Sequence, residues 1–170
     1  MVEVLQSIRA ARVGDADAVA AVHDAAWREA YRGIIPGAAL EAMVARRGPV
    51  WWRSAIRRGS RLLVLEFDRT IAGYVSHGRN RVSSVPYAGE IFELYLSPAF
   101  QGLGFGRRLF EAAREDLAGA GYLSFVVWAL ADNDRATGFY RSMGGREVRR
   151  APERFGQESR PRVAFGFAQD

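Results

Sequence analysis

The spacing of apolar residues changes several times along the chain and predicts alternating blocks of helix and strand. A short strand is predicted over Ser7–Arg12. Helical spacing follows in three segments, Ala18–Tyr31, Ala38–Ala45 and Trp51–Arg58. The period then shortens, and two strands are predicted on either side of a tight turn at Asp68-Arg69, namely Leu62–Phe67 and Ile71–Gly78.

The second half of the chain continues this alternation. Strands are predicted over Glu90–Leu96, Phe125–Leu130, Glu147–Arg150 and Arg162–Phe167, and helices over Arg107–Ala118 and Asn133–Met143. The strand at Phe125–Leu130 is apolar on both faces, which is typical of the middle of a sheet. No repeat or linker interrupts this order. We therefore expect one α/β domain over residues 1–170, with a mixed sheet and helices on both of its faces.

The composition excludes several kinds of chemistry. The 170 residues are 49% hydrophobic and 25% charged, which is ordinary for a soluble globular protein. The chain has no cysteine, which excludes a thiolate metal site, and it has only two histidines, so we expect no metal centre. All 24 basic residues are arginines, which excludes Schiff-base lysine chemistry and any phosphate-binding loop that needs lysine.

The charge and the apolar runs also limit the partners. A net charge of +5 permits an anionic ligand without requiring nucleic acid. No apolar run approaches the ~20 residues needed to cross a bilayer, and Met1–Arg12 lacks the apolar segment of a secretory signal. We therefore expect a cytoplasmic protein with no nucleic-acid partner and no membrane partner.

A glycine-rich turn follows the strand that ends at Leu96. Gly102, Gly104 and Gly106 stand between this strand and the next predicted helix. Without side chains at these positions, backbone N–H groups can converge on an anion at the helix N-terminus. The dinucleotide pattern G-x-G-x-x-G lacks its last glycine here, and the phosphate loop of nucleotide triphosphatases lacks its lysine. The alternative is a turn that serves only tight strand–helix packing.

The turn and its context resemble a known signature. Gln101-x-x-Gly104-x-Gly106, preceded by Leu94-Tyr95-Leu96-Ser97-Pro98, is similar to the pyrophosphate-binding motif of the GNAT family of N-acetyltransferases. Leu103 departs from this motif, because a basic residue is common there, and the departure is expected to weaken phosphate attraction.

Two further segments carry the resemblance, which extends from about Ile8 to Phe167. Asn133-x-x-Ala136-x-x-Phe139-Tyr140-x-x-x-Gly144 resembles the next motif of the family. Trp27-x-x-x-Tyr31-Arg32-Gly33-Ile34-Ile35-Pro36 is similar to the helix and loop that overlie the substrate in many members. Asn133 could equally be a helix cap, and Tyr140 a core aromatic residue. Gly145 stands where an aromatic residue is usual, so we expect a looser core contact there.

The resemblance implies a fold and a cosubstrate. The fold is the GNAT-like acyl-CoA N-acyltransferase fold, with a mostly antiparallel central sheet. The cosubstrate is acetyl-CoA, and no metal is implied. The residues expected to bind it are Leu94, Tyr95, Leu96, Gln101, Gly102, Leu103, Gly104, Phe105, Gly106, Arg107, Asn133 and Tyr140. Its pantetheine arm would pair with the backbone of Leu94–Leu96 like an extra strand, in a wedge left where the next strand diverges.

The implied reaction is direct transfer of an acetyl group to a primary amine in a ternary complex. The backbone N–H of Leu96 is the expected oxyanion donor. Tyr140 is expected to donate a hydrogen bond to the leaving thiolate, and to act as a general acid only if its pKa is lowered. A carboxylate must accept the amine proton, and Glu90 is favoured over Glu93, which strand alternation places on the opposite face. Both could instead be solvated or salt-bridged, with water as the base.

The acceptor amine is left open between a small molecule and a protein N-terminus. Trp27, Tyr31 and Glu93 are its expected contacts, and the segments expected to frame its pocket are Arg32–Pro36, Arg81–Ala88 and Pro152–Pro161. The alternative function is a non-catalytic acyl-CoA sensor or partner module, for which Tyr140 and Glu90 would be unnecessary. Dimers are common in the family, so a homodimer also stays open.

Overall fold

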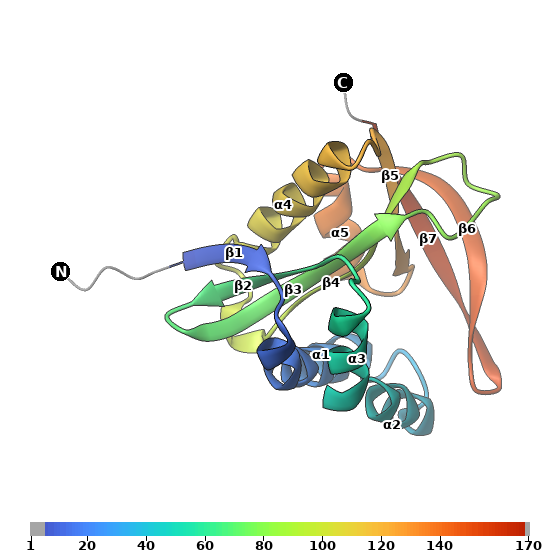
Figure 1. The fold of residues 1–170 in the computed structure, drawn as a ribbon. Helices are drawn as coiled ribbons and strands as arrows, with labels where there is room; N and C mark the ends of the chain where they lie inside the picture. Colours follow the sequence, from blue (N-terminus) through green and yellow to red (C-terminus); the bar gives the residue numbers. More distant parts are fainter. Residues whose placement is uncertain (1–5, 169–170) are drawn as a thin grey trace.

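A computed structural model describes residues 6–168, which form one seven-stranded sheet with helices on both faces (Figure 1). In the order of the sheet, the strands are β1 (Gln6–Ala10), β2 (Leu62–Phe67), β3 (Thr70–Arg79), β4 (Gly89–Leu96), β5 (Ser124–Leu130), β7 (Glu158–Ala168) and β6 (Arg146–Phe155). Neighbouring strands are antiparallel except β4 and β5, which are parallel. The predicted mixed, mostly antiparallel sheet is confirmed.

The helices divide between the two faces of the sheet. They are α1 (Ala16–Tyr31), α2 (Gly37–Arg46), α3 (Pro49–Arg57), α4 (Phe105–Gly119) and α5 (Asp134–Ser142), with short 3₁₀ turns η1 (Val13–Asp15) and η2 (Pro98–Phe100). Figure 1 shows α1, α2 and α3 on one side of the sheet and α4 and α5 on the other. We call these sides the α1 face and the α4 face. Each predicted helix is present, within two residues of its expected ends.

The last two strands are longer than predicted. The sequence indicated strands only at Glu147–Arg150 and Arg162–Phe167, whereas β6 and β7 form a long hairpin that turns at Gly156. Two prolines lie opposite each other in this hairpin, Pro152 and Pro161. Because proline cannot donate a hydrogen bond to a neighbouring strand, their presence argued against longer strands in the sequence. The edge position of β6 tolerates Pro152.

A dense aromatic core on the α4 face corrects the expectation for Gly145. A Cβ atom at this position would lie 2.7 Å from the ring of Phe167 and 2.8 Å from the carbonyl oxygen of Tyr140. The Phe167 ring in turn stacks on Phe125 at 4.9 Å between centroids. The predicted loosening is therefore wrong, because Phe167 fills the space that a side chain at position 145 would take.

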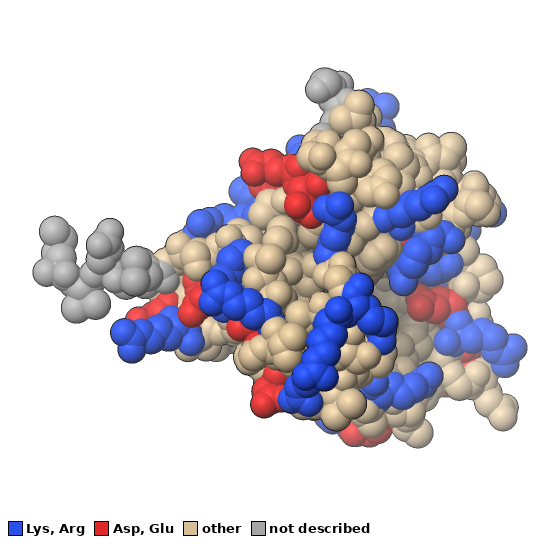
Figure 2. Space-filling model, in the orientation of Figure 1, with Lys and Arg blue, Asp and Glu red and all other residues tan. Residues whose placement is uncertain are grey.

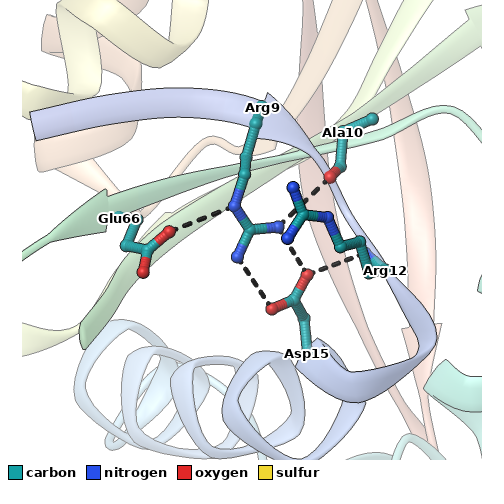
Figure 3. Close-up of polar contacts among 5 residues, drawn as sticks. All are labelled: Arg9, Ala10, Arg12, Asp15 and Glu66. Carbon is teal, nitrogen blue, oxygen red and sulfur yellow. Dashed lines mark hydrogen bonds and ion pairs between the residues drawn. The ribbon is translucent and has the colours of Figure 1, made fainter. Parts of the chain in front are cut away.

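An ion-pair cluster fixes the entry to α1 beside the sheet edge (Figure 3). Arg9 of β1 donates to both carboxylate oxygens of Asp15, at 2.8 and 3.0 Å, and to Glu66 of β2 at 3.1 Å. Asp15 also accepts the backbone N–H of Arg12 at 2.7 Å. Arg9 holds the pKa of Asp15 below its usual value. Asp15 is thus the N-cap residue of α1, but its side chain caps the preceding turn instead of α1 itself.

Within residues 6–168, no helix is both long and apolar enough to cross a bilayer. The expected lack of a secretory signal concerns Met1–Arg12, of which residues 1–5 lie outside the described part. In the same described part, no group of three or more histidine and carboxylate side chains is placed to hold a metal ion.

Candidate active site

The two parallel strands at the centre of the sheet diverge. β4 and β5 pair only where Gly89–Ile91 faces Phe125–Val127. Beyond this point β4 remains paired with β3 alone, up to Leu96. The wedge implied by the family resemblance is therefore present.

Backbone groups of β4 point into this wedge. The N–H of Ser97 donates to the carbonyl of Ala72 in β3 at 2.8 Å. Because N–H groups alternate in direction along a strand, those of Leu94 and Leu96 point the other way, toward β5. The side chain of Gln101 reaches the same side and donates to the carbonyl of Leu96 at 3.3 Å. Leu94 and Leu96 thus offer an unpaired strand edge to an extended ligand.

A cavity of about 650 Å³ occupies the wedge. Its walls come from α1, the end of β4, the glycine turn and α5. They include ten of the residues expected to bind or act on acetyl-CoA, namely Leu94, Tyr95, Leu96, Gln101, Gly102, Gly104, Gly106, Arg107, Asn133 and Tyr140. Leu103 is exposed and Phe105 is buried in the core, so neither lines the cavity.

The glycine turn has the backbone geometry that an anion site needs. Gly104 is the N-cap of α4 and has φ +83°, a conformation that side chains disfavour. The first N–H groups of α4, beginning at Phe105, have no partner inside the helix. At Gly106 a Cβ would lie 3.6 Å from Phe139, an ordinary contact, and a Cβ at Gly102 or Gly104 would have no neighbour within 4 Å. Tight strand–helix packing therefore does not account for these glycines, and anion binding stays a prediction.

Asn133 and Tyr140 line the cavity from α5. The side chain of Asn133 accepts the backbone N–H of Ala136 at 3.2 Å, so it is a helix cap as well as a cavity residue. Tyr140 is 6% exposed and packs against Phe110, Phe139 and Phe165. Burial raises the pKa of Tyr140. Its hydroxyl therefore stays protonated at neutral pH and is suited to donate a hydrogen bond.

A β-bulge changes the predicted directions of the two β4 carboxylates. Ser76 of β3 pairs with Glu93, and the next residue of β3 pairs with Ile91, which leaves Phe92 as the extra residue of β4. The bulge interrupts the alternation between Glu90 and Glu93, so both side chains lie on the α1 face. The prediction that they point to opposite faces is wrong, because it assumed a regular strand.

Glu93 is held beside the cavity by partners from distant segments. Its Oε2 accepts the hydroxyl of Tyr74 at 2.7 Å, and its Oε1 forms an ion pair with Arg47, which lies between α2 and α3. The carboxylate side chain is 11% exposed. Tyr95, two residues further along the same face, lines the cavity. The sequence did not reveal Arg47 or Tyr74, because no local pattern links them to Glu93.

A pair of tyrosines connects α1 to β4 beside the cavity. The hydroxyls of Tyr31 and Tyr95 lie 2.7 Å apart. The indole of Trp27 packs against both rings, with centroids 5.0 Å from Tyr31 and 6.0 Å from Tyr95. Burial raises the pKa of Tyr31 to about 12, so it is neutral at physiological pH. The three predicted acceptor contacts, Trp27, Tyr31 and Glu93, thus gather around Tyr95.

Glu90 lies farther from the cavity and has other partners. It is 2% exposed, and its two oxygens accept the backbone N–H of Arg81 and two guanidinium N–H groups of the same residue, at 3.0 to 3.3 Å. Leu94 lies four residues along β4, roughly 13 Å away at the usual rise per residue. The structure therefore brings Glu93, and not Glu90, next to the tyrosine pair.

An ion pair crosses the cavity between its two helical walls. Glu29 of α1 and Arg135 of α5 both line the cavity, and Arg135 donates to Glu29 at 3.4 Å. These residues are 106 positions apart in the chain, so nothing in the sequence indicated that they meet.

Comparison with known proteins identifies the family. The profile of the acetyltransferase (GNAT) family matches residues 24–144. An uncharacterized N-acetyltransferase of Bacillus subtilis, YuaI, is 30% identical over 128 residues, which cover 75% of this chain and 73% of that protein. The chain belongs to the GNAT family. This GNAT protein is therefore an acetyl-CoA-dependent acyltransferase.

Solved structures share the GNAT fold of this chain. The PaiA N-acetyltransferase of Thermoplasma acidophilum, in complex with coenzyme A, superposes with a TM-score of 0.75 at 18% identity, over 93% of this chain and 98% of that chain. YncA of Salmonella typhimurium, with acetyl-CoA, gives a TM-score of 0.69 at 19% identity, over 98% of this chain and 95% of that chain. At these low sequence identities, the superpositions show that the fold is shared and show nothing further.

Proposed function

We propose that this protein transfers an acetyl group from acetyl-CoA directly to a primary amine, with both substrates bound at once in the wedge between β4 and β5. The observation that carries the proposal is the cavity of about 650 Å³, whose walls extend from the glycine turn before α4 to Tyr95 and Tyr140. Acetyl-CoA supplies the activated acetyl group, as a thioester.

The residues of the wedge fit coenzyme A from end to end. Backbone N–H groups at the start of α4 suit the pyrophosphate, and Arg107 adds a positive charge beside them. The free strand edge of Leu94 and Leu96 suits the amide groups of the pantetheine arm. Asn133 lies on the opposite wall. The arm would reach Leu96 before Leu94, since the glycine turn follows the end of β4.

Two groups are placed to stabilise negative charge during the reaction. The N–H groups of Leu94 and Leu96 are the candidate oxyanion donors, and such a donor contributes about 3 kcal/mol in other acyl transfers. Tyr140 would donate a hydrogen bond to the departing sulfur. Its pKa is raised and not lowered, so it serves as a donor and not as a general acid.

The amine must lose a proton before it can attack, because an ammonium ion has no lone pair. Glu93 is better placed than Glu90 to receive this proton through water, since it adjoins the cavity residues Leu94 and Tyr95. Its ion pair with Arg47 and the hydrogen bond from Tyr74 hold the carboxylate in this position.

The test is an assay of the purified protein with acetyl-CoA and a panel of primary amines. Release of free thiol and formation of the N-acetylated amine are measured in parallel. The proposal predicts equal amounts of thiol and acetylated product for at least one amine. Binding of acetyl-CoA without product from any amine would instead support the sensor function, and thiol release without acetylated amine would indicate hydrolysis.

A further inference from the structure

Arg162 of β7 is a partly buried cation without an ion-pair partner. The other partly buried arginines of residues 6–168 each form an ion pair with a carboxylate; they are Arg9, Arg28, Arg47, Arg53, Arg114 and Arg160. Within this described part of the chain, Arg162 is the exception. A buried charge is costly unless it is paired, so an unpaired one marks a site for an anionic ligand.

Two buried N–H donors lie at this position, one from Arg162 itself and one from Trp128. The guanidinium carbon of Arg162 lies 4.2 Å from the ring centroid of Trp128, so the flat group stacks on the indole. The Nε of Arg162 and the Nε1 of Trp128 are both buried, and neither has a hydrogen-bond partner among residues 6–168. Stacking of this kind fixes the plane of the guanidinium and leaves its edge for a planar oxyanion such as a carboxylate.

The Arg162–Trp128 pair lies on the same side of the sheet as the acceptor end of the cavity. Arg162 is the cross-strand partner of Leu130, and Leu130 packs with Trp27 and Tyr31. β7 lies two strand positions from β4, roughly 10 Å before the divergence is added. Figure 2 shows the surface hollowed between the helices of the α1 face and the β6–β7 hairpin, with both basic and acidic side chains on its rim. A small molecule could span this distance to Tyr95.

One acidic residue of the neighbouring strand, Glu153, lies diagonally across the β6–β7 pair from Arg162. Glu153 of β6 interacts electrostatically with Arg162, but the two form no ion pair in the described structure. Burial raises the pKa of Glu153, and Arg162 only partly opposes this effect. Glu153 therefore does not occupy the hydrogen-bonding edge of the Arg162 guanidinium, since no hydrogen bond or ion pair joins the two in the described residues.

We propose that the acceptor is a small molecule with a carboxylate at one end and a primary amine several bonds away, as in an amino acid with a side-chain amine, and that Arg162 and the indole N–H of Trp128 bind this carboxylate. The amine would then point past Tyr31 toward Tyr95 and the thioester. The inference rests on the proposed acetyl transfer, and it specifies the class of acceptor for the same site.

The first experiment compares amino acids with their carboxamides as acceptors. Each carboxamide keeps the amine and the side chain but lacks the carboxylate. We expect kcat/KM to be about tenfold higher, or more, for the acid than for its carboxamide, which corresponds to ~1.4 kcal/mol. The amine of a carboxamide loses its proton more readily, so a preference for the acid cannot come from amine basicity.

The second experiment removes the proposed contacts. Arg162→Gln should raise KM for the amino acid about tenfold or more and abolish the preference over the carboxamide, with acetyl-CoA affinity unchanged within twofold. Trp128→Phe keeps an aromatic ring and removes the N–H donor, so it should weaken the preference in a folded protein. Arg150→Gln is the matched control, because Arg150 lies on β6 opposite the core residue Val163, is 57% exposed and should change nothing.

The outcomes separate this inference from the proposed function. Equal or better use of carboxamides and simple amines, or an unchanged preference in Arg162→Gln, would overturn the inference and leave acetyl transfer standing. Binding of acetyl-CoA without acetylation of acids, carboxamides or amines would overturn acetyl transfer and the inference with it.

Discussion

At the scale of single residues, Tyr140 is the side chain whose role can be isolated most cleanly. Tyr140→Phe removes the hydroxyl and keeps the ring that packs against Phe110 and Phe139. Because we propose that this donor acts on the leaving sulfur, we expect turnover to fall about tenfold or more, while KM for acetyl-CoA stays within twofold. Steady-state kinetics would check this. A turnover within twofold of the parent would show that the hydroxyl has no such role.

The two β4 carboxylates can be compared directly. Glu93→Gln should lower kcat/KM for the amine about tenfold or more at neutral pH, and the loss should shrink as the pH rises toward the pKa of the amine, because the amine then deprotonates without help. Glu90→Gln is the matched variant, since it also leaves an arginine without its carboxylate partner. A larger loss in Glu90→Gln than in Glu93→Gln would return the role of base to Glu90.

His23 makes stability depend on pH. It is fully buried against Trp27 and Trp52, and burial lowers its pKa from 6.5 to about 4. The unfolded chain therefore binds this proton between pH 6.5 and 4 while the folded one does not. The contribution of neutral His23 to the free energy of unfolding is therefore complete above pH 6.5. As the pH falls toward 4, the free energy of unfolding should decrease by about 3 kcal/mol. Urea unfolding at a series of pH values, compared with His23→Phe, would measure it; equal slopes in the two proteins would refute it.

At the scale of elements, the turn from β4 to α4 is the part that we propose binds the pyrophosphate of acetyl-CoA. Gly104→Val forces a branched side chain into a left-handed conformation beside the anion site. We expect acetyl-CoA affinity to fall about tenfold or more. Gly121→Val is the control, because Gly121 has φ +89° in open space after α4, away from the cavity. Calorimetric titration of both variants with acetyl-CoA would separate the effect of backbone strain, which both share, from loss of the binding turn. Similar affinities of the two variants for acetyl-CoA would contradict the proposed role of the turn.

The elements also show what the sequence could and could not predict. Helices and most strands followed from apolar spacing, and the glycine turn and α5 followed from residues that lie close together in the chain. The bulge at Phe92 has no local signature, so the directions of Glu90 and Glu93 could not be derived. The β6–β7 hairpin was underestimated because prolines interrupt its pattern. Contacts such as those of Arg47 with Glu93, or Glu29 with Arg135, depend on how distant segments pack.

At the scale of the whole molecule, the account depends on one consequence of the topology. A parallel pair of strands separates at the centre of the sheet, and the helix that follows the first of them begins with bare backbone. On the α1 face, Tyr31, Tyr95 and Glu93 gather at the end proposed to bind the acceptor. Cosubstrate and acceptor would thus approach the same wedge from different sides of the molecule, which is what direct transfer requires.

Isothermal titration of the purified protein with acetyl-CoA tests this central claim most directly. The account predicts saturable binding of one acetyl-CoA per chain and competition by coenzyme A. In a parallel unfolding experiment, acetyl-CoA at a hundredfold excess over the dissociation constant should raise the free energy of unfolding by ~2.7 kcal/mol. Absence of saturable binding, or binding that coenzyme A does not compete for, would contradict it.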